Sequence, residues 1–294
     1  MASKSRLVVV IASLGRPDDI GDFLHELERQ TRRPDGLVLS VTEEADLPSD
    51  LKPGMAEIVI GSKGLCAQRN RGLAHIGTDY DYVAFFDDDY LPTVKTIENI
   101  CAFLDANPEI VGMEGFLIAD GINGPGIGRQ DALDLIAGYV EPTGDAVNEV
   151  EERHDLYGCN MIYRVSAIED ARFDEVLPAY GWLEDVDFSN QLLARGRLVK
   201  TNAFAGVHRG TKRSRSPGKK LGYSQISNPI YLLRKGTMSR SDAYVQIARN
   251  LVANHAKIFT PEPWVDRKGR AAGNWRGLSD LVRGKINPGN ISNL

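Results

Sequence analysis

Two groups of acidic residues in this sequence have a spacing that could serve chemistry. The first is the run Asp87, Asp88 and Asp89, which directly follows the apolar letters "VAFF". Like charges this close repel one another unless a cation offsets them, and carboxylate oxygens are ligands that Mg²⁺ and Mn²⁺ prefer. The run therefore predicts a divalent-metal site at the end of a strand. The alternative is a capped turn that starts a helix near Pro92.

The second acidic group lies in "YGWLEDVDFS", which contains Glu184, Asp185 and Asp187 close behind Trp182. A carboxylate at a helix start, beside an aromatic residue, can act as a general base toward a hydroxyl. Acidic residues also favour the first turn of a helix for electrostatic reasons alone. Both interpretations stay open from these residues.

The charge distribution is uneven. Between Asp187 and Asp242 there is no acidic residue, whereas 12 of the 35 Lys and Arg residues lie there. The rest of the chain therefore carries 23 basic against 40 acidic residues, a net charge of −17. Such a local basic tract indicates an anionic partner, unless it is simply a solvated loop.

The bulk composition predicts an ordinary globular protein. The chain has 294 residues, of which 42% are hydrophobic and 26% charged. Three widely spaced cysteines suggest neither a disulfide framework nor a zinc site, which fits a reduced, cytoplasmic location. The first apolar run, "LVVVIA", is too short for a signal peptide, and no stretch reaches the roughly 20 apolar residues of a membrane span.

Strand and helix patterns alternate along most of the chain, which predicts an α/β fold with a largely parallel sheet. Asp18 and Asp19 are expected to cap the first helix. After an irregular stretch, 197–210 is expected to form a final pair of strands, and the last ~30 residues a polar tail. We expect strands at 6–13, 35–42, 56–61, 81–87, 109–118 and 157–164, and helices from 18 and at 64–77, 93–108, 131–140, 182–196, 228–236 and 241–259.

Several stretches, taken in order, resemble family 2 glycosyltransferases of the GT-A fold. They are "IASLGRP", "GLCAQRNRGL", "FFDDDY", "GCNMIYRVSAI" and "GWLEDVDFSNQLLARGRL". The resemblance spans roughly residues 6 to 236. It implies a three-layer α/β/α sandwich with a mostly parallel central sheet. A catalytic, nucleotide-sugar-binding domain would cover residues 1–236, followed by a helical extension and polar tail over 237–294.

The resemblance also implies roles for individual residues. Asp185 matches the general base of inverting members, and Glu184 would help to place it. The metal, Mn²⁺ or Mg²⁺, would be held by Asp87, Asp89 and His208. The donor would be contacted by Ala12, Ser13, Leu14, Arg16, Arg69, Asn70 and Asp88. The acceptor or a mobile lid would involve Trp182, Arg209, Lys212, Arg213 and Arg215.

One segment departs from the family pattern. Many members end the second strand with an aspartate that reads uracil, whereas this chain has "LSVTEEAD". Ser40, Thr42 and Glu43 are the candidates for that role here, so the identity of the donor base stays open.

The resulting expectation is a metal-dependent inverting glycosyltransferase that moves a sugar from a nucleotide-sugar, in particular a UDP-sugar. The acceptor would be a hydroxyl of a glycan, a lipid-linked molecule or another compound in a bacterial-type polysaccharide or glycoconjugate pathway. The basic tract at 195–220 could close over the diphosphate or touch an anionic membrane at its inner face. Nucleic acid is disfavoured as a partner because the remainder of the chain is acidic.

Two rival functions remain. A nucleotidyltransferase acting on sugar phosphates would call for a glycine-rich basic loop after the first strand, and "SLGRPDD" has one glycine and one arginine. A protein that binds a nucleotide-sugar or another anion without turnover would need no base.

Overall fold

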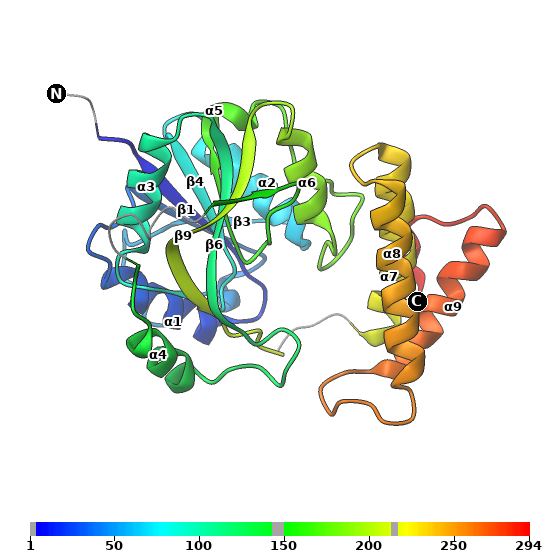
Figure 1. The fold of residues 1–294 in the computed structure, drawn as a ribbon. Helices are drawn as coiled ribbons and strands as arrows, with labels where there is room; N and C mark the ends of the chain where they lie inside the picture. Colours follow the sequence, from blue (N-terminus) through cyan, green and yellow to red (C-terminus); the bar gives the residue numbers. More distant parts are fainter. Residues whose placement is uncertain (1–3, 143–149, 213–216) are drawn as a thin grey trace.

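The computed structural model describes residues 4–142, 150–212 and 217–294 (Figure 1). In this part of the chain nine strands form one sheet. The strands are β1 (Leu7–Ala12), β2 (Gly36–Val41), β3 (Glu57–Ile60), β4 (Tyr82–Phe86), β5 (Tyr90–Pro92), β6 (Ile110–Asp120), β7 (Val150–Arg153), β8 (Asn160–Arg164) and β9 (Arg197–His208).

The sheet is mixed, with most strands running the same way. Its order is β3-β2-β1-β4-β8-β6-β9-β5, and β7 pairs with the other end of β9. The pairings make β1, β2, β3, β4, β6 and β9 parallel to one another, whereas β5, β7 and β8 are antiparallel to them. Six of the nine described strands therefore share one direction, and the predicted mostly parallel sheet is confirmed.

Helices cover both faces of this sheet. They are α1 (Pro17–Glu28), α2 (Leu65–Ile76), α3 (Thr96–Ala106), α4 (Arg129–Gly138), α5 (Val165–Ile168) and α6 (Glu184–Leu192), with a 3₁₀ turn η1 (Glu44–Asp46) after β2.

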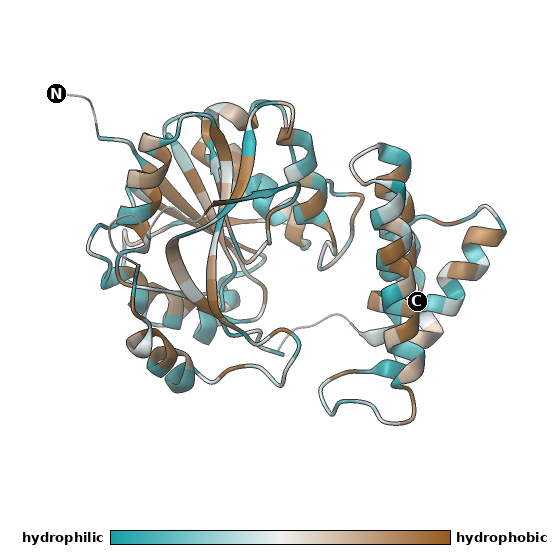
Figure 2. Cartoon of the chain, viewed as in Figure 1, coloured by the Kyte–Doolittle hydropathy of each residue, from teal (hydrophilic) through white to brown (hydrophobic). Residues whose placement is uncertain are grey.

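The side chains of β1 alternate between the two faces, as they must in a strand. Leu7, Val9 and Ile11 pack into the core with α1 and α3, whereas Val8 and Val10 pack into the core with α2 and α6. Hydrophobic residues accordingly concentrate along the strands (Figure 2). The predicted three-layer α/β/α sandwich is confirmed.

Three further helices stand beside the sandwich: α7 (Gly218–Lys235), α8 (Arg240–Ala256) and α9 (Arg267–Val282), followed by η3 (Pro288–Asn293). α7 and α9 approach each other so closely that a Cβ atom on Gly222 would lie 2.1 Å from the Arg270 carbonyl oxygen. α7 also contacts the sandwich through Leu232. Because α7 packs with the two later helices, we propose that the helical extension begins at Gly218, earlier than the boundary expected at 236.

Three local expectations are wrong. Residues 197–208 form one long strand, β9, because β6 and β7 pair along its length and hold it extended. α9 lies within the expected polar tail. Asp18 and Asp19 do not occupy the N-cap position of the first helix, because the helix begins at Pro17 and its N-cap residue is Arg16, whose side chain makes no capping hydrogen bond. Asp19 is buried. Sequence reasoning also missed the short strands β5 and β7, and it began α7 ten residues too late, at 228.

None of the described helices is both long enough and apolar enough to cross a membrane.

Candidate active site

The candidate site forms where β1 and β4 end side by side. The two strands are parallel, and Ile11 lies opposite Phe86, so the residues after each strand meet beyond the same sheet edge. Ser13 donates a hydrogen bond from Oγ to Oδ2 of Asp88 at 2.5 Å. Arg16 donates from Nη1 to Oδ1 of Asp88 at 3.0 Å. Asp88 is thus tied to the loop after β1.

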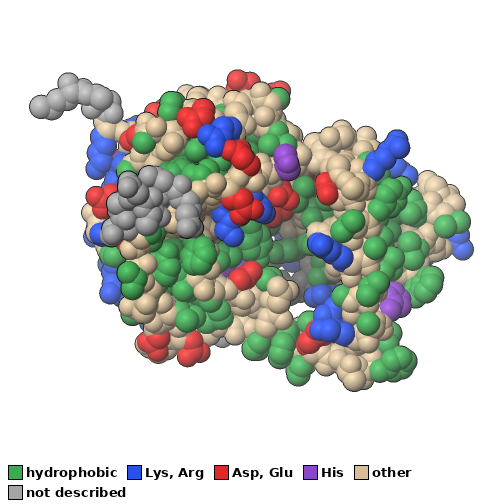
Figure 3. Space-filling view, viewed as in Figure 1, with side chains coloured by type: hydrophobic (Ala, Val, Ile, Leu, Met, Phe, Trp, Pro, Cys, Tyr) green, Lys and Arg blue, Asp and Glu red, His purple; other side chains and the backbone are tan. Residues whose placement is uncertain are grey.

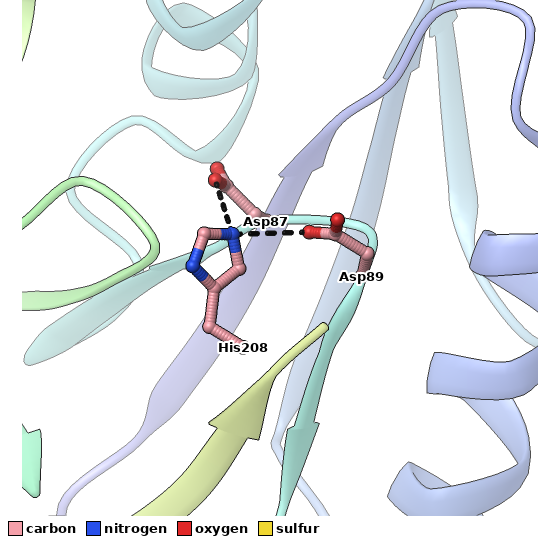
Figure 4. Close-up of side chains that lie close together, drawn as sticks. All are labelled: Asp87, Asp89 and His208. Carbon is pink, nitrogen blue, oxygen red and sulfur yellow. Dashed lines mark ion pairs between the residues drawn. The ribbon is translucent and has the colours of Figure 1, made fainter. Parts of the chain in front are cut away.

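Asp87, Asp89 and His208 form a separate cluster (Figure 4). Nε2 of His208 lies 3.9 Å from Oδ2 of Asp87 and 3.4 Å from Oδ1 of Asp89. One ligand atom from each residue lies within 4.8 Å of the others. His208 arrives here because it ends β9 and pairs with Tyr90 of β5, just after the aspartate run.

This cluster fits a divalent cation. Two ligand atoms that bind one Mg²⁺ ion at about 2.1 Å can be at most about 4.2 Å apart, and the two measured separations from Nε2 meet this limit. The other ring nitrogen of His208, Nδ1, lies 2.8 Å from Oδ1 of Asp120. With an N–H at Nδ1 donating to Asp120, loss of the Nε2 proton would leave the lone pair of Nε2 facing the aspartates, as metal-ligating histidines require.

The charges in the cluster are strongly coupled. Burial alone would lower the pKa of His208, but its hydrogen bonds to Asp120 and Asp89 raise that pKa to about 10. Burial would raise the pKa of Asp89, yet the hydrogen bond and charge of His208 bring that pKa below its usual value. For Asp88, burial outweighs the charge of Arg16 and raises the pKa. A protonated His208 therefore offsets the charge of the carboxylates beside it, and a cation bound through Nε2 would replace that proton.

Arg69, from α2, connects this cluster to the second acidic group. Its guanidinium donates to Oε1 of Glu184, to Oδ1 of Asp87 at 3.1 Å and to the carbonyl oxygen of Gly158 at 2.8 Å. It is 2% exposed and lies 5.4 Å from the ring centre of Phe173. Sequence analysis placed Arg69 on the donor; its described contacts hold the two acidic groups together.

Glu184 and Asp185 begin α6, and their carboxylates are held differently. Oε2 of Glu184 is buried and has no hydrogen-bond partner among the described residues. Burial, opposed by the charge of Arg69, raises the pKa of Glu184 to about 8. Asp185 is partly exposed, and its Oδ2 accepts a hydrogen bond from the Gly158 backbone N–H at 3.0 Å. Desolvation raises the pKa of Asp185, a direction that suits a proton acceptor.

Gly158 is the point at which these contacts meet. Its carbonyl accepts from Arg69, and its N–H donates to Asp185. A Cβ atom at this position would lie 3.2 Å from both Oδ2 of Asp185 and Oε1 of Glu184, closer than side-chain packing ordinarily allows. Glycine therefore lets the backbone approach both carboxylates.

The third acid of the group has a structural partner. Asp187 is fully buried, and its carboxylate accepts hydrogen bonds from Lys235 Nζ at 2.8 Å and Thr237 Oγ1 at 2.6 Å. Both donors lie at the end of α7, so Asp187 ties the helix that carries Asp185 to the helical extension.

The predicted donor residues after β1 and β2 lie in or beside two loops that hydrogen bonds from and to Asp46 and Gln68 hold together. Asp46 accepts from Gly15 N at 2.6 Å, from Thr42 N at 2.9 Å and from Thr42 Oγ1 at 2.8 Å. Gln68 donates to the carbonyl oxygens of Ser13 and Ser40. The Oγ of Ser40 is buried without a hydrogen-bond partner among the described residues. Ala12 and Leu14 are partly exposed, and Glu43 is exposed.

Other predicted residues are engaged elsewhere. Asn70 bonds to the backbone of Phe173 in both directions, and the carbonyl of Trp182 accepts from Asn228 of α7. Arg209 pairs with Asp19 at 3.1 Å and with Asp22. Lys212 donates to the carbonyl oxygens of Gly121 and Ile122. Arg213 and Arg215 lie outside the described residues.

Sequence reasoning missed Asp46, Gln68, Asp120 and Gly158. Asp46 is the last letter of "LSVTEEAD" and Gln68 lies within "GLCAQRNRGL", so a signal for both was present. Asp120 had no signal, because it meets His208 only through the pairing of β6 with β9, which contains three register shifts.

A cavity of about 910 Å³ opens beside this site, between the start of α1, residues 44–51 and β3. Its described lining includes none of the predicted catalytic, metal or donor residues.

Comparison with known proteins places the fold. Residues 44–172, less than half of the chain, match the model of glycosyl transferase family 2. No curated protein matches the sequence. Among solved structures, S. aureus TarS 1-349 in complex with UDP-GlcNAc is 14% identical with a TM-score of 0.51, and 95% of this chain covers 92% of that one. GalNAc-T7 with UDP, GalNAc and Mn²⁺ is 13% identical with a TM-score of 0.53, and 96% of this chain covers 58% of that one.

The chain spans 44% of the length of a longer S. aureus TarS chain. The likeness to these structures shows that the chain has the GT-A fold. The family match bears out the resemblance to family 2 glycosyltransferases over residues 44–172, whereas "IASLGRP" and "GWLEDVDFSNQLLARGRL" lie outside the matched residues.

Proposed function

We propose that this protein is a metal-dependent inverting glycosyltransferase that moves a sugar from a UDP-sugar to an acceptor hydroxyl. The observation that carries the proposal is the link, through Arg69 and Gly158, between a cation-competent cluster and a separate, partly exposed carboxylate. A metal-dependent inverting transferase uses two such groups, one to hold the cation that offsets diphosphate charge and one to accept a proton.

The choice of donor rests on the comparisons. TarS 1-349 binds UDP-GlcNAc or UDP, and GalNAc-T7 binds UDP with Mn²⁺. Transfer of these ligands to this chain is an inference from a shared fold. The buried Oγ of Ser40 and the loops fixed by Asp46 and Gln68 lie at the strand ends where the fold binds its nucleotide.

A Mn²⁺ or Mg²⁺ ion held by Asp87, Asp89 and His208 would offset negative charge on the diphosphate as it leaves. The chain supplies the rest of the arrangement. Arg16, paired with Asp88 and 3.8 Å from Asp89, adds a positive charge beside the same loop. Asp120 holds the ring of His208 in the orientation that ligation needs.

Asp185 would take the proton from the acceptor hydroxyl. The acceptor oxygen then forms a bond to the anomeric carbon while the bond from that carbon to the phosphate oxygen breaks, and the diphosphate leaves with the bonding electrons. One displacement inverts the anomeric centre, so one base suffices. The two backbone N–H groups that donate to Asp185, from Gly158 and Val186, orient the carboxylate for this role.

The test is a thermal-shift panel of nucleoside diphosphates and nucleotide-sugars with and without Mn²⁺. We expect UDP and UDP-sugars to stabilise the protein only with the metal, and Asp89→Asn to lose that stabilisation. Asp105→Asn, at an acid of α3 outside the site, is the matched control and should respond as the wild type does. No response to any nucleoside diphosphate under either condition would contradict the proposal.

A further inference from the structure

The helical extension carries an exposed apolar surface that the catalytic proposal does not use. α8 presents Val245 and Val252, seven residues apart and therefore on one face of the helix. α9 presents Trp275 and Val282 with the same spacing. We call the following set of exposed residues the α8–α9 outer face: Tyr244, Val245, Val252, Phe259, Trp275 and Val282.

The two helices contribute to one continuous surface. The ring of Trp275 packs edge-on against His255 of α8, with ring centres 5.7 Å apart. Hydrophobic side chains gather along α8 in the space-filling view (Figure 3). Phe259 and Val282 are 92% and 88% exposed, and exposed apolar patches, rather than single residues, mark contact surfaces.

This surface is set among basic residues. Residues 237–294 contain nine Lys and Arg but four Asp and Glu. Arg249 lies between Val245 and Val252 on α8, and Lys268 precedes Trp275 by one heptad on α9; both are exposed. The acidic residues are engaged locally, as when Glu262 pairs with Lys257 and Arg267. The face therefore combines apolar and positive groups.

These properties favour an anionic bilayer over a second copy of the chain. An isologous dimer through this face would bring the same basic residues of two copies together, and like charges would repel. Aromatic and aliphatic side chains on a basic helical surface suit the boundary between lipid headgroups and acyl chains. Acidic headgroups add attraction for each nearby Lys or Arg.

We propose that the α8–α9 outer face docks the protein on the surface of an anionic lipid bilayer. The described part of the basic tract at 195–220 serves this purpose less well. Its Arg209 pairs with Asp19 and Asp22, and its Arg197 pairs with Glu109 and Glu152. The proposal concerns where the protein sits and is independent of the proposed reaction.

The experiment is flotation of the full chain with phosphatidylcholine vesicles, with and without phosphatidylglycerol. We expect binding only to vesicles that contain phosphatidylglycerol, and weaker binding at high salt. The double variant Val252→Asp, Phe259→Asp should lower the partition coefficient by about tenfold or more, because it removes apolar contact and adds negative charge. Val94→Asp, at another exposed valine, before α3, should bind as the wild type does.

A second variant separates charge from packing. Arg249→Glu with Lys268→Glu, both on the exposed surface, should also reduce binding, and circular dichroism checks that each variant is folded. Absence of binding to phosphatidylglycerol vesicles, or binding unchanged by both double variants, would overturn the proposal. So would a dimer that the Val252→Asp, Phe259→Asp variant dissociates in sedimentation without any vesicle binding, because that result would assign the face to a second copy.

Discussion

Replacement of Arg69 by Met would separate the two acidic groups of the site. The substitution keeps a long, unbranched side chain at this position but removes the guanidinium that bonds to Glu184, Asp87 and Gly158. Above about pH 8, where Glu184 is ionised, loss of one partner from this buried ion pair costs about 3 to 5 kcal/mol, because the other charge is left buried and unpaired. Asp87 is a quarter exposed at its side chain, so water screens part of its share.

We therefore expect Arg69→Met to lower the free energy of unfolding by about 3 kcal/mol. For a chain of this length that corresponds to a fall in Tm of roughly 5 °C. Urea unfolding followed by tryptophan fluorescence measures the first quantity, and calorimetry the second. Transfer activity should fall more than nucleotide affinity, because Gly158 and Asp185 lose their fixed positions.

A double-mutant cycle sharpens this test. In Arg69→Met, Glu184→Gln the unpaired carboxylate is removed, so the double variant should be more stable than Arg69→Met alone. If Arg69→Met unfolds within about 0.5 kcal/mol of the wild type, as an ordinary surface substitution does, Arg69 does not join the two groups and the reasoning fails.

Three further predictions follow from the same contacts. Asp185→Asn should retain UDP binding in calorimetry and lose transfer; transfer at the wild-type rate would show that the base lies elsewhere. Glu184 has a pKa of about 8 when folded against 4.5 ordinarily, so the native state holds its proton more tightly than the unfolded state does. The free energy of unfolding should therefore fall as pH rises from about 5 to 8. Glu184→Gln should flatten that slope in urea titrations, and an unchanged slope would contradict the pKa shift. Lys235→Met leaves buried Asp187 with fewer donors and should cost about 1 to 3 kcal/mol in urea unfolding, whereas exposed Arg234→Met, the neighbouring control, should cost under about 0.5 kcal/mol.

Local sequence patterns predicted the sandwich because its strands and helices each carry their own periodicity. "LVVVIA" is apolar on both faces, as a central strand must be, and β1 is central. β9 could not be recognised as one strand, because partners distant in sequence, β6 and β7, hold it extended. α9 contains glycines that argue against a helix, but Gly273 lets α9 pack against the backbone of α7.

The site was predictable where residue type alone signals chemistry. The run at Asp87 and the pair Glu184 and Asp185 stood out because crowded carboxylates are costly without a purpose. The partners that orient them were not predictable, since Gly158 acts through its backbone and Asp120 through strand register. The assignment of Arg69 to the donor stays a prediction. Its contacts with both acidic groups were not predictable, because they depend on the packing of α2 against the sheet edge.

Isothermal titration of UDP into the protein, with Mn²⁺ and then with EDTA, tests the central claim most directly. The account predicts saturable one-to-one binding of UDP with Mn²⁺ and little binding with EDTA. In Asp89→Asn, UDP should bind weakly whether or not Mn²⁺ is present. Equal UDP binding with Mn²⁺ and with EDTA, or no UDP binding at all, would contradict a metal-dependent nucleotide site at Asp87, Asp89 and His208.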